Sequence, residues 1–488
     1  MANQHKRGTS RTQTALLPPA IEDYVREGTV VRLIDEYVCG LDLVRLGYAK
    51  SVPARTGRPA YAPDDLLRLY LYGYWQRVRS SRRLELECQR NLEVMWRLGE
   101  LAPDHKTIAE FRRVNGGALG ALCAQFVQFL REVKLVGGEA AVVAVDGSKF
   151  KACASKKSVP TAEQLKKARK RIERRVAEYL AQLDEADREE EGEAAPTKEQ
   201  IEAAIQRLRE RNKKLEQAQE RLESEHPGED SARVSLTDPD CVLLNAKGVG
   251  ALAGYNVQHA VDTQHHLIVA HEVTTLGNDH TSLEPMARAA QEGLEAQALT
   301  AVADCGYMNG AQAKGCEERG ITPVVPMAKP AQTRAADCYP KTMFAYDAAS
   351  DTYRCPAGEV LKRYKRDRAK QTDYYWSFAC ANCAQKSLCT TAKRRSIARS
   401  WHADAAERAA QRARARPWLM RLRSASAEHP FGNLKAMLPG GFSVRTLPKV
   451  RGEMALAVLT YNLKRAANIL TSSKLSSQLR TARAFGSA

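Results

Sequence analysis

The sequence predicts an α/β layer fold that is preceded by an all-helical domain and interrupted by two insertions. Between residues 137 and 326 the patterns run strand, strand, strand, helix, strand, helix, strand, an order typical of α/β layers. Helical periodicity dominates before that region, and five cysteines cluster between residues 327 and 394. A length of 488 residues, with 44% hydrophobic and 27% charged residues, fits a globular protein of several folding units.

Residues 1–136 are predicted to form a helical N-terminal DNA-binding domain. Leu66, Leu69 and Tyr70 recur on one face of the chain, as the apolar stripe of an amphipathic helix requires. Arginines are frequent in this region, which favours a module that reads DNA. A plain helical packing domain also fits, because no helix-turn-helix signature is sharp enough to decide.

The α/β layer is expected to occupy residues 137–160 and 231–326. Its strands are predicted from short apolar or alternating runs bounded by glycines and turns, at residues 140–145, 255–261, 267–274, 299–303 and 321–325. Residues 280–294 and 309–319 have the spacing of helices. Ligands of such layers bind beyond the carboxyl ends of the strands, so the residues that follow the strands are candidates for the site.

The first insertion, residues 161–230, is predicted to be a helical hairpin with coiled-coil character. Thr161 and Thr197 are each followed three residues later by glutamine, which is the pattern of a capping box at a helix start. Residues 189–195 are expected to form the turn between the two helices. An arm for protein–protein contact and a solvated spacer both fit this segment.

The second insertion, residues 327–394, is predicted to bind zinc. Cys380 and Cys383 form a CxxC pair, with Cys389 downstream and Cys355 upstream. Four thiolates around Zn²⁺ would fold a small module that has little core of its own. Unliganded reduced thiols are the main alternative, and an iron–sulfur cluster is a minor one.

The charge balance points to a polyanionic partner. The chain has 75 Lys and Arg against 57 Asp and Glu, a net charge of +18, which favours nucleic acid over the alternative of simple solubility. No stretch approaches 18 uninterrupted apolar residues, and no secretory signal is recognisable at the start. The expectation is therefore a cytoplasmic, nucleoid-associated protein of prokaryotic type with no membrane partner.

Two aspartates follow predicted strands and precede a nearby glycine. Asp146 ends the first strand of the layer, and Asp304 ends the run at residues 299–303. Two carboxylates that converge at strand ends would repel each other unless a divalent cation lay between them, and Mg²⁺ and Mn²⁺ prefer such oxygen ligands. Either aspartate could instead simply cap a turn.

A third acid is expected nearer the C-terminus. Glu428 and Lys435 are seven residues apart, which is two turns along one face of a helix. Pro430 disfavours helical geometry at the residue before it, so Glu428 is expected at or just before a helix start, or at a kink. Glu453 is the rival third acid, although the leucine spacing of its helix indicates core packing.

Five short motifs are each weak evidence of a family, but their occurrence in this order along the chain is specific. They are residues 142–149, 254–258, 303–307, 428–432 and 459–465. With these motifs the chain resembles an insertion-sequence DDE transposase, of the branch that carries a cysteine-bearing insertion before the catalytic glutamate. The resemblance spans most of the chain and implies an RNase H-like catalytic core, a mixed sheet with helices, which agrees with the strand order above.

The resemblance implies that Asp146, Asp304 and Glu428 are the DDE triad and hold two Mg²⁺ or Mn²⁺ ions. One ion would activate water or a DNA 3′-hydroxyl, and the other would stabilise the leaving oxygen. Residues 395–470 would then be the C-terminal helices of the core, and residues 471–488 are expected to be a flexible tail.

Similar transposases carry a Tyr and an Arg before the glutamate and a Lys after it. Lys435 fits the last of these positions. Arg421 and Ser424 stand where the Tyr and Arg would be, so the resemblance does not assign those two roles. Arg423, one position away, is interpreted as the substitute phosphate contact.

The basic run before Glu428 is predicted to contact DNA. Residues 391–423 hold ten basic and two acidic residues. Helical spacing places Arg408 and Arg412 on one face, with Arg416 one turn further. A solvated basic helix is the alternative to a path for double-stranded DNA.

The resulting functional hypothesis is a DNA transposase. It would bind the ends of its mobile element, cleave them and transfer the 3′-hydroxyl ends to target DNA. A metal-dependent nuclease without strand transfer and a catalytically silent DNA-binding derivative are the alternatives. A homodimer is expected, because two ends must be handled together.

Overall fold

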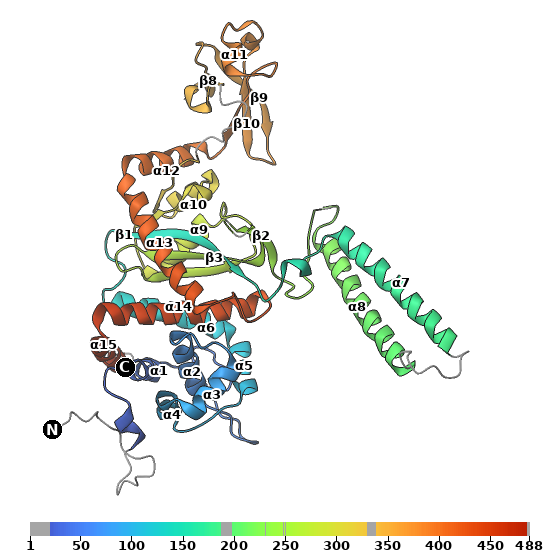
Figure 1. The fold of residues 1–488 in the computed structure, drawn as a ribbon. Helices are drawn as coiled ribbons and strands as arrows, with labels where there is room; N and C mark the ends of the chain where they lie inside the picture. The colour runs from blue at the N-terminus through green and yellow to red at the C-terminus, as the bar shows by residue number, and fades with distance from the viewer. Residues whose placement is uncertain are drawn as a thin grey trace, which may run out of the picture. The chain divides into compact units, whose positions relative to one another are not determined.

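The computed structural model describes residues 20–186, 198–229, 231–246, 248, 250–328 and 338–485 (Figure 1). The chain divides into two compact units. The first unit combines the chain up to Leu122 with the chain from Ala455 onward, and the second, here the catalytic unit, runs from Cys123 to Met454. The end of the C-terminal helices expected in the core therefore groups with the N-terminal region.

The N-terminal region is helical, as predicted. Its helices are α1 (Val30–Cys39), α2 (Pro63–Trp75), α3 (Ser81–Arg90), α4 (Leu92–Leu98), α5 (His105–Val114) and α6 (Gly116–Glu132). Side-chain caps explain where two of them begin, because Asn91 accepts from the amides of α4 and Asp104 accepts from Thr107 N at 2.7 Å. The Tyr70 hydroxyl donates to Ile108 O at 2.8 Å and links α2 to α5 inside the core.

The catalytic unit is built on a six-stranded mixed sheet. Its strands are β1 (Ala141–Lys151), β2 (Val242–Ala246), β3 (Gly250–Asp262), β4 (Ile268–Thr274), β5 (Leu299–Val302) and β6 (Ile321–Val324). The strand order is β4-β3-β1-β5-β6, with β2 also paired to β3. β1 runs antiparallel to β3 and parallel to β5, and β6 is parallel to β5. This is the RNase H-like arrangement that was expected, with β2 as a strand that the sequence did not predict.

Two helices connect the later strands of this sheet. They are α9 (Leu283–Leu294) and α10 (Gly310–Glu318), and the 3-10 turn η3 (Cys305–Tyr307) follows β5. The apolar residues at helical spacing in α9, such as Met286, Ala287 and Ala290, are buried. The predicted helices are therefore present, each slightly shorter than expected.

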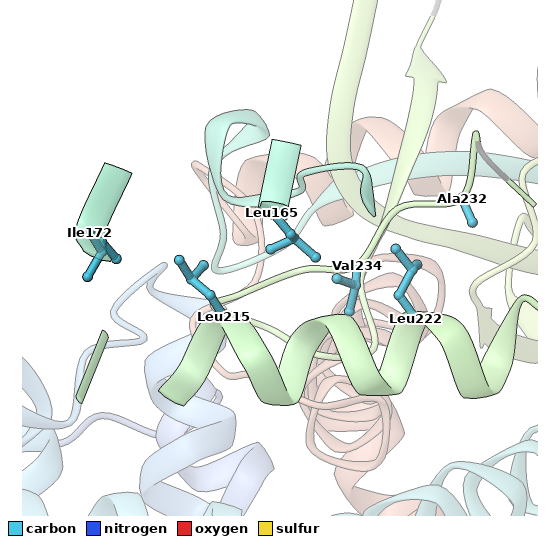
Figure 2. Close-up of a cluster of buried hydrophobic side chains, with 6 residues drawn as sticks. All are labelled: Leu165, Ile172, Leu215, Leu222, Ala232 and Val234. Atoms are coloured by element: carbon cyan, nitrogen blue, oxygen red, sulfur yellow. The ribbon is translucent and has the colours of Figure 1, made fainter. Parts of the chain in front are cut away.

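The first insertion is a helical hairpin of α7 (Ala162–Ala186) and α8 (Lys198–Glu225). The predicted capping box at Thr161 is present, with Gln164 Oε1 accepting from Thr161 N at 3.0 Å. Leu215 and Leu222 of α8 point toward Leu165 of α7 and Val234 (Figure 2), in one buried cluster. The expected turn at residues 189–195 and the second capping threonine lie outside the described residues.

The second insertion forms a five-stranded antiparallel sheet, here the small domain. Its strands are β7 (Ala345–Asp347), β8 (Thr352–Arg354), β9 (Val360–Asp367), β10 (Thr372–Trp376) and β11 (Ile397–Ser400). Two short pieces, η5 (Phe378–Asn382) and α11 (Lys386–Cys389), carry Cys380 and Cys389, and Cys383 directly follows η5. The expectation of little core was wrong, because Tyr353, Leu361 and Tyr375 pack together inside the sheet with Phe344 and Ile397.

Four helices complete the chain. They are α12 (Ala403–Ala415), α13 (Pro417–Met437), α14 (Leu447–Leu470) and α15 (Ser472–Phe485). The expected flexible tail is mostly helix α15, because Leu475 and Leu479 are buried and burial of apolar surface stabilises an ordered helix. Among the described helices, none combines the length and the apolar character that a membrane span needs.

Candidate catalytic site

Asp146 and Asp304 lie on neighbouring strands of the central sheet. The expectation that Asp146 ends its strand was wrong, because β1 continues to Lys151, whereas Asp304 does lie just past the end of β5. β1 and β5 are parallel neighbours, with Ala144 opposite Val302. Asp146 and Asp304 each follow two residues after that pair, so the shared register brings them to adjacent positions. Asp304 Oδ1 accepts from Gly306 N at 2.8 Å and thereby starts the turn η3.

Charged groups surround the Asp146 carboxylate. Arg423 of α13 forms an ion pair with it, with NH1 3.1 Å from Oδ2. Burial raises the pKa of Asp146, the Arg423 guanidinium opposes that rise, and the negative charges of Asp304 and Asp279 add to it. Two further carboxylates therefore lie close enough to act on Asp146, and Asp279 is one that the sequence analysis missed.

Glu428 lies on the same helix as Arg423. α13 continues through Pro430, so Glu428 is inside a helix and not at a helix start. Ser424 Oγ donates to Glu428 Oε1 at 3.0 Å, one turn earlier on α13, and Glu428 is exposed. Within the described ranges, no three His, Cys, Asp or Glu side chains are grouped closely enough to hold a metal ion.

The surroundings of Glu453, the rival third acid, are those of a residue that stabilises the fold. Its side chain is fully buried in α14. Its Oε2 accepts hydrogen bonds from Ser443 N at 2.8 Å and Val444 N at 3.3 Å. A buried carboxylate that satisfies two backbone amides stabilises the turn before α14, which agrees with the core packing read from the sequence.

The predicted phosphate contacts lie in different surroundings. Lys435 is exposed on α13, with Nζ 5.7 Å from the centroid of the Phe150 ring. Arg421 is exposed on the same helix. Arg423 faces Asp146, and its side chain is only 14% exposed.

The basic run on α12 is partly engaged within the protein. Arg408 and Arg412 both form ion pairs with Glu317 of α10. Arg412 NH1 also donates to Pro323 O at 3.3 Å. Arg416, at the junction of α12 and α13, is exposed. Three arginines of this run were expected to meet DNA. Two of them, Arg408 and Arg412, instead pair with α10.

The four predicted zinc ligands line one cavity in the small domain. Cys355, Cys380, Cys383 and Cys389 are among the residues that line a cavity of about 30 Å³, although among the described residues no three of them are grouped closely enough to hold a metal ion. Burial raises the pKa of the Cys389 thiol, nearby Arg395 opposes that rise, and the three other thiols add to it. The tertiary structure thus brings together cysteines that are up to 34 residues apart in the chain.

Two family profiles match the chain. The profile described as "Transposase domain (DUF772)" matches residues 19–114, and the profile described as "Transposase DDE domain" matches residues 245–463. No curated protein matches. Among solved structures, the piggyBac transposase synaptic complex with hairpin DNA is similar, with 8% sequence identity, a TM-score of 0.32, and coverage of 93% of this chain and 77% of that chain. That structural likeness is too weak to bear on the site.

The first profile covers helices α1 to α5, and the second covers the catalytic unit from the end of β2 onward and continues into α14. The second profile includes Asp304 and Glu428, and Asp146 lies on the strand that pairs with β5. Together with the RNase H-like sheet, these matches show that the chain belongs to the insertion-sequence DDE transposases, DNA-transposing enzymes that depend on divalent metal ions.

Proposed function

We propose that the protein binds both ends of its mobile element, cleaves them and joins the 3′-hydroxyl ends to target DNA. The observation that carries this proposal is the adjacency of Asp146, within β1, and Asp304, just past the end of the parallel neighbour β5. Arg423 forms an ion pair with Asp146, and the helix α13 that carries Arg423 also carries Glu428. We further propose a homodimer, because two ends must be cut and joined together.

Asp146, Asp304 and Glu428 are the residues that would hold two Mg²⁺ ions. The two aspartates fit a divalent cation, because their mutual repulsion is among the causes that raise the pKa of Asp146. Bound ions would make a hydroxyl nucleophilic and stabilise the leaving oxygen. Arg423 balances the charge of Asp146 through their ion pair. Ser424 orients Glu428 through its hydrogen bond.

Zinc in the small domain is also part of the proposal. The proposal is supported by the fact that the four cysteines line one cavity, because thiolates are the ligands of structural zinc sites. The cavity lies between the sheet and the short pieces η5 and α11, since residues of all three line it. A zinc ion there would tie these two pieces to the sheet.

The small domain offers a surface for DNA. Residues 338–400 contain 13 basic and five acidic residues. Arg394 stacks over the rings of Trp376 and Phe378, at 4.3 and 4.6 Å from their centroids. Phe378 is 72% exposed. Cations interleaved with exposed aromatic rings are typical of nucleic-acid contacts, so we place DNA on this face.

A product assay tests the function as a whole. Purified protein is incubated with Mg²⁺ and DNA that carries both ends of its element, and the products are sequenced. We expect element ends joined to new target positions through their 3′ strands. Ends that are cut but never joined would establish the nuclease alternative instead, and DNA that is bound but uncut would establish the silent derivative.

A salt-dependence measurement tests where DNA lies. Each lost phosphate contact lowers the slope of log affinity against log salt by roughly 0.9. Replacing exposed Lys365 and half-buried Arg394 together with Gln is expected to lower the slope by about twice that amount. Arg408→Gln is the control and should leave the slope unchanged, because Arg408 is already paired with Glu317.

The same measurement includes the α12 path. The triple variant Arg408→Gln, Arg412→Gln, Arg416→Gln tests it. Arg408 and Arg412 are held by ion pairs with Glu317, so among the described residues only Arg416 of these three lacks an ion pair and is available to phosphate. A fall in the salt slope that corresponds to three lost phosphate contacts in the triple variant, with an unchanged slope in the small-domain variant, would show that DNA lies along α12 and not on the small domain.

A further inference from the structure

A polar network lies inside the catalytic unit, on residues that the proposed chemistry does not use. Asp279 Oδ1 accepts hydrogen bonds from Asn256 Nδ2 and Gln258 Nε2, each at 2.7 Å. Gln258 Oε1 in turn accepts from the Tyr307 hydroxyl. Lys149 Nζ lies 3.5 Å from the same oxygen of Asp279. The network therefore joins β1, β3, the loop before α9 and the turn η3.

The network and α13 lie on opposite faces of the sheet. Asp146 is the register partner of His259, and His259 stacks on Phe431 of α13 with ring centroids 4.4 Å apart. The next pair along the strands is Gly147 and Gln258. Successive residues of a strand point to opposite faces, so Gln258 supports β1 from the face that α13 does not cover.

The network packs directly against the residue after Asp146. A Cβ at Gly147 would lie 2.3 Å from Gln258 Nε2, 2.9 Å from Asp279 Oδ1 and 3.0 Å from Tyr307 Oη. These polar atoms thus fill the space that a side chain would need, and any side chain at position 147 would have to displace them. The network therefore packs against the backbone of Gly147, the residue that follows Asp146.

The other end of the network reaches the second aspartate. Tyr307 is the last residue of η3, the turn that Asp304 starts. Asn256, Gln258 and Tyr307 are almost fully buried. Breaking one of the hydrogen bonds that these side chains make would leave a further buried polar group without a partner, which is costly. The bonded side chains are therefore held in place.

We propose that Asp279, Gln258 and Tyr307 are positioning residues that hold the carboxylates of Asp146 and Asp304 at the separation a divalent cation requires. The inference rests on the proposed metal-binding role of the two aspartates. Residues that orient metal ligands typically change metal affinity by about 10- to 100-fold when they are replaced, and an effect of that size is expected here.

Mn²⁺ binding to the DNA-free protein, measured by titration calorimetry, tests the proposal. Tyr307→Phe and Asp279→Ala are each expected to weaken Mn²⁺ binding by about tenfold or more. Asp279→Asn should stay close to wild type, because its amide oxygen can accept the same two hydrogen bonds. The matched control is Tyr255→Phe, since the Tyr255 hydroxyl is likewise a buried donor in the catalytic unit, but to Asp238 Oδ1, at 2.8 Å, outside this network.

The outcomes separate positioning from the metal role itself. Wild-type Mn²⁺ affinity in Tyr307→Phe, together with loss of binding in Asp146→Ala, would overturn the positioning alone. An equal loss in Tyr255→Phe would also overturn it, since any buried hydroxyl would then matter. Wild-type affinity in Asp146→Ala would overturn the metal role and this inference with it. If Asp279→Ala does not fold, Tyr307→Phe carries the test.

Discussion

Replacing Asp146, Asp304 or Glu428 with Ala is expected to abolish DNA cleavage while leaving the affinity for element ends nearly unchanged. Metal ions supply several kcal/mol of transition-state stabilisation, and each 1.4 kcal/mol is a factor of about ten in rate, so the loss should reach about a thousandfold. Affinity comes mainly from cationic contacts to phosphate, which these substitutions leave in place. Single-turnover cleavage and equilibrium binding, measured on the same DNA, check both halves.

Glu453→Ala serves as the contrasting variant. Because Glu453 is buried and accepts from the amides of Ser443 and Val444, its removal should lower the free energy of unfolding by about 1–3 kcal/mol. Cleavage by the folded fraction should persist. Full activity in Glu428→Ala, with none in folded Glu453→Ala, would show that Glu453 is the third catalytic acid.

Replacing Cys380 and Cys383 together with Ser is expected to remove zinc and loosen the small domain. In zinc-finger peptides structural zinc contributes about 10–16 kcal/mol of binding free energy, which is also folding free energy. Part of the sheet should survive, because Tyr353, Leu361 and Tyr375 provide an apolar core. Elemental analysis of protein reconstituted with zinc, with limited proteolysis of the small domain, gives the readout.

Cys338→Ser is the matched control for the zinc variant. Cys338 belongs to the same insertion but does not line the cavity of the four predicted ligands. Its replacement should leave both the zinc content and the proteolysis pattern as in the wild type. Zinc content that is unchanged in the Cys380→Ser, Cys383→Ser variant would rule out these residues as ligands.

Local patterns in the sequence predicted much of the fold. The runs that became β1, β3, β4, β5 and β6 are recognisable because strand residues alternate or form short buried runs. The capping box at Thr161 needs only two side chains three residues apart. Asp146 and Asp304 could be singled out because each follows such a run. These features depend on neighbours in the chain, so they can be read without knowing the fold.

The small domain shows where local reading fails. Lys362, Arg363 and Arg366 fill β9 with charge, so the alternating pattern of a half-buried strand is hidden. Its core comes from Tyr353 and Tyr375, which are 22 residues apart in the chain and meet only through pairing with β9. The sheet therefore could not be predicted from the composition of the insertion.

The sequence by itself determined the order of most elements and singled out Asp146 and Asp304, although Asp146 proved to lie within β1 and only Asp304 past the end of its strand. Only the tertiary structure decided which side chains meet Asp146. Arg423 reaches it from 277 positions away, and Asp279 acts on it from a loop 133 positions away. Such partners are set by strand register and by helix packing across the sheet. Both depend on contacts between distant segments, so no local pattern in the chain encodes them.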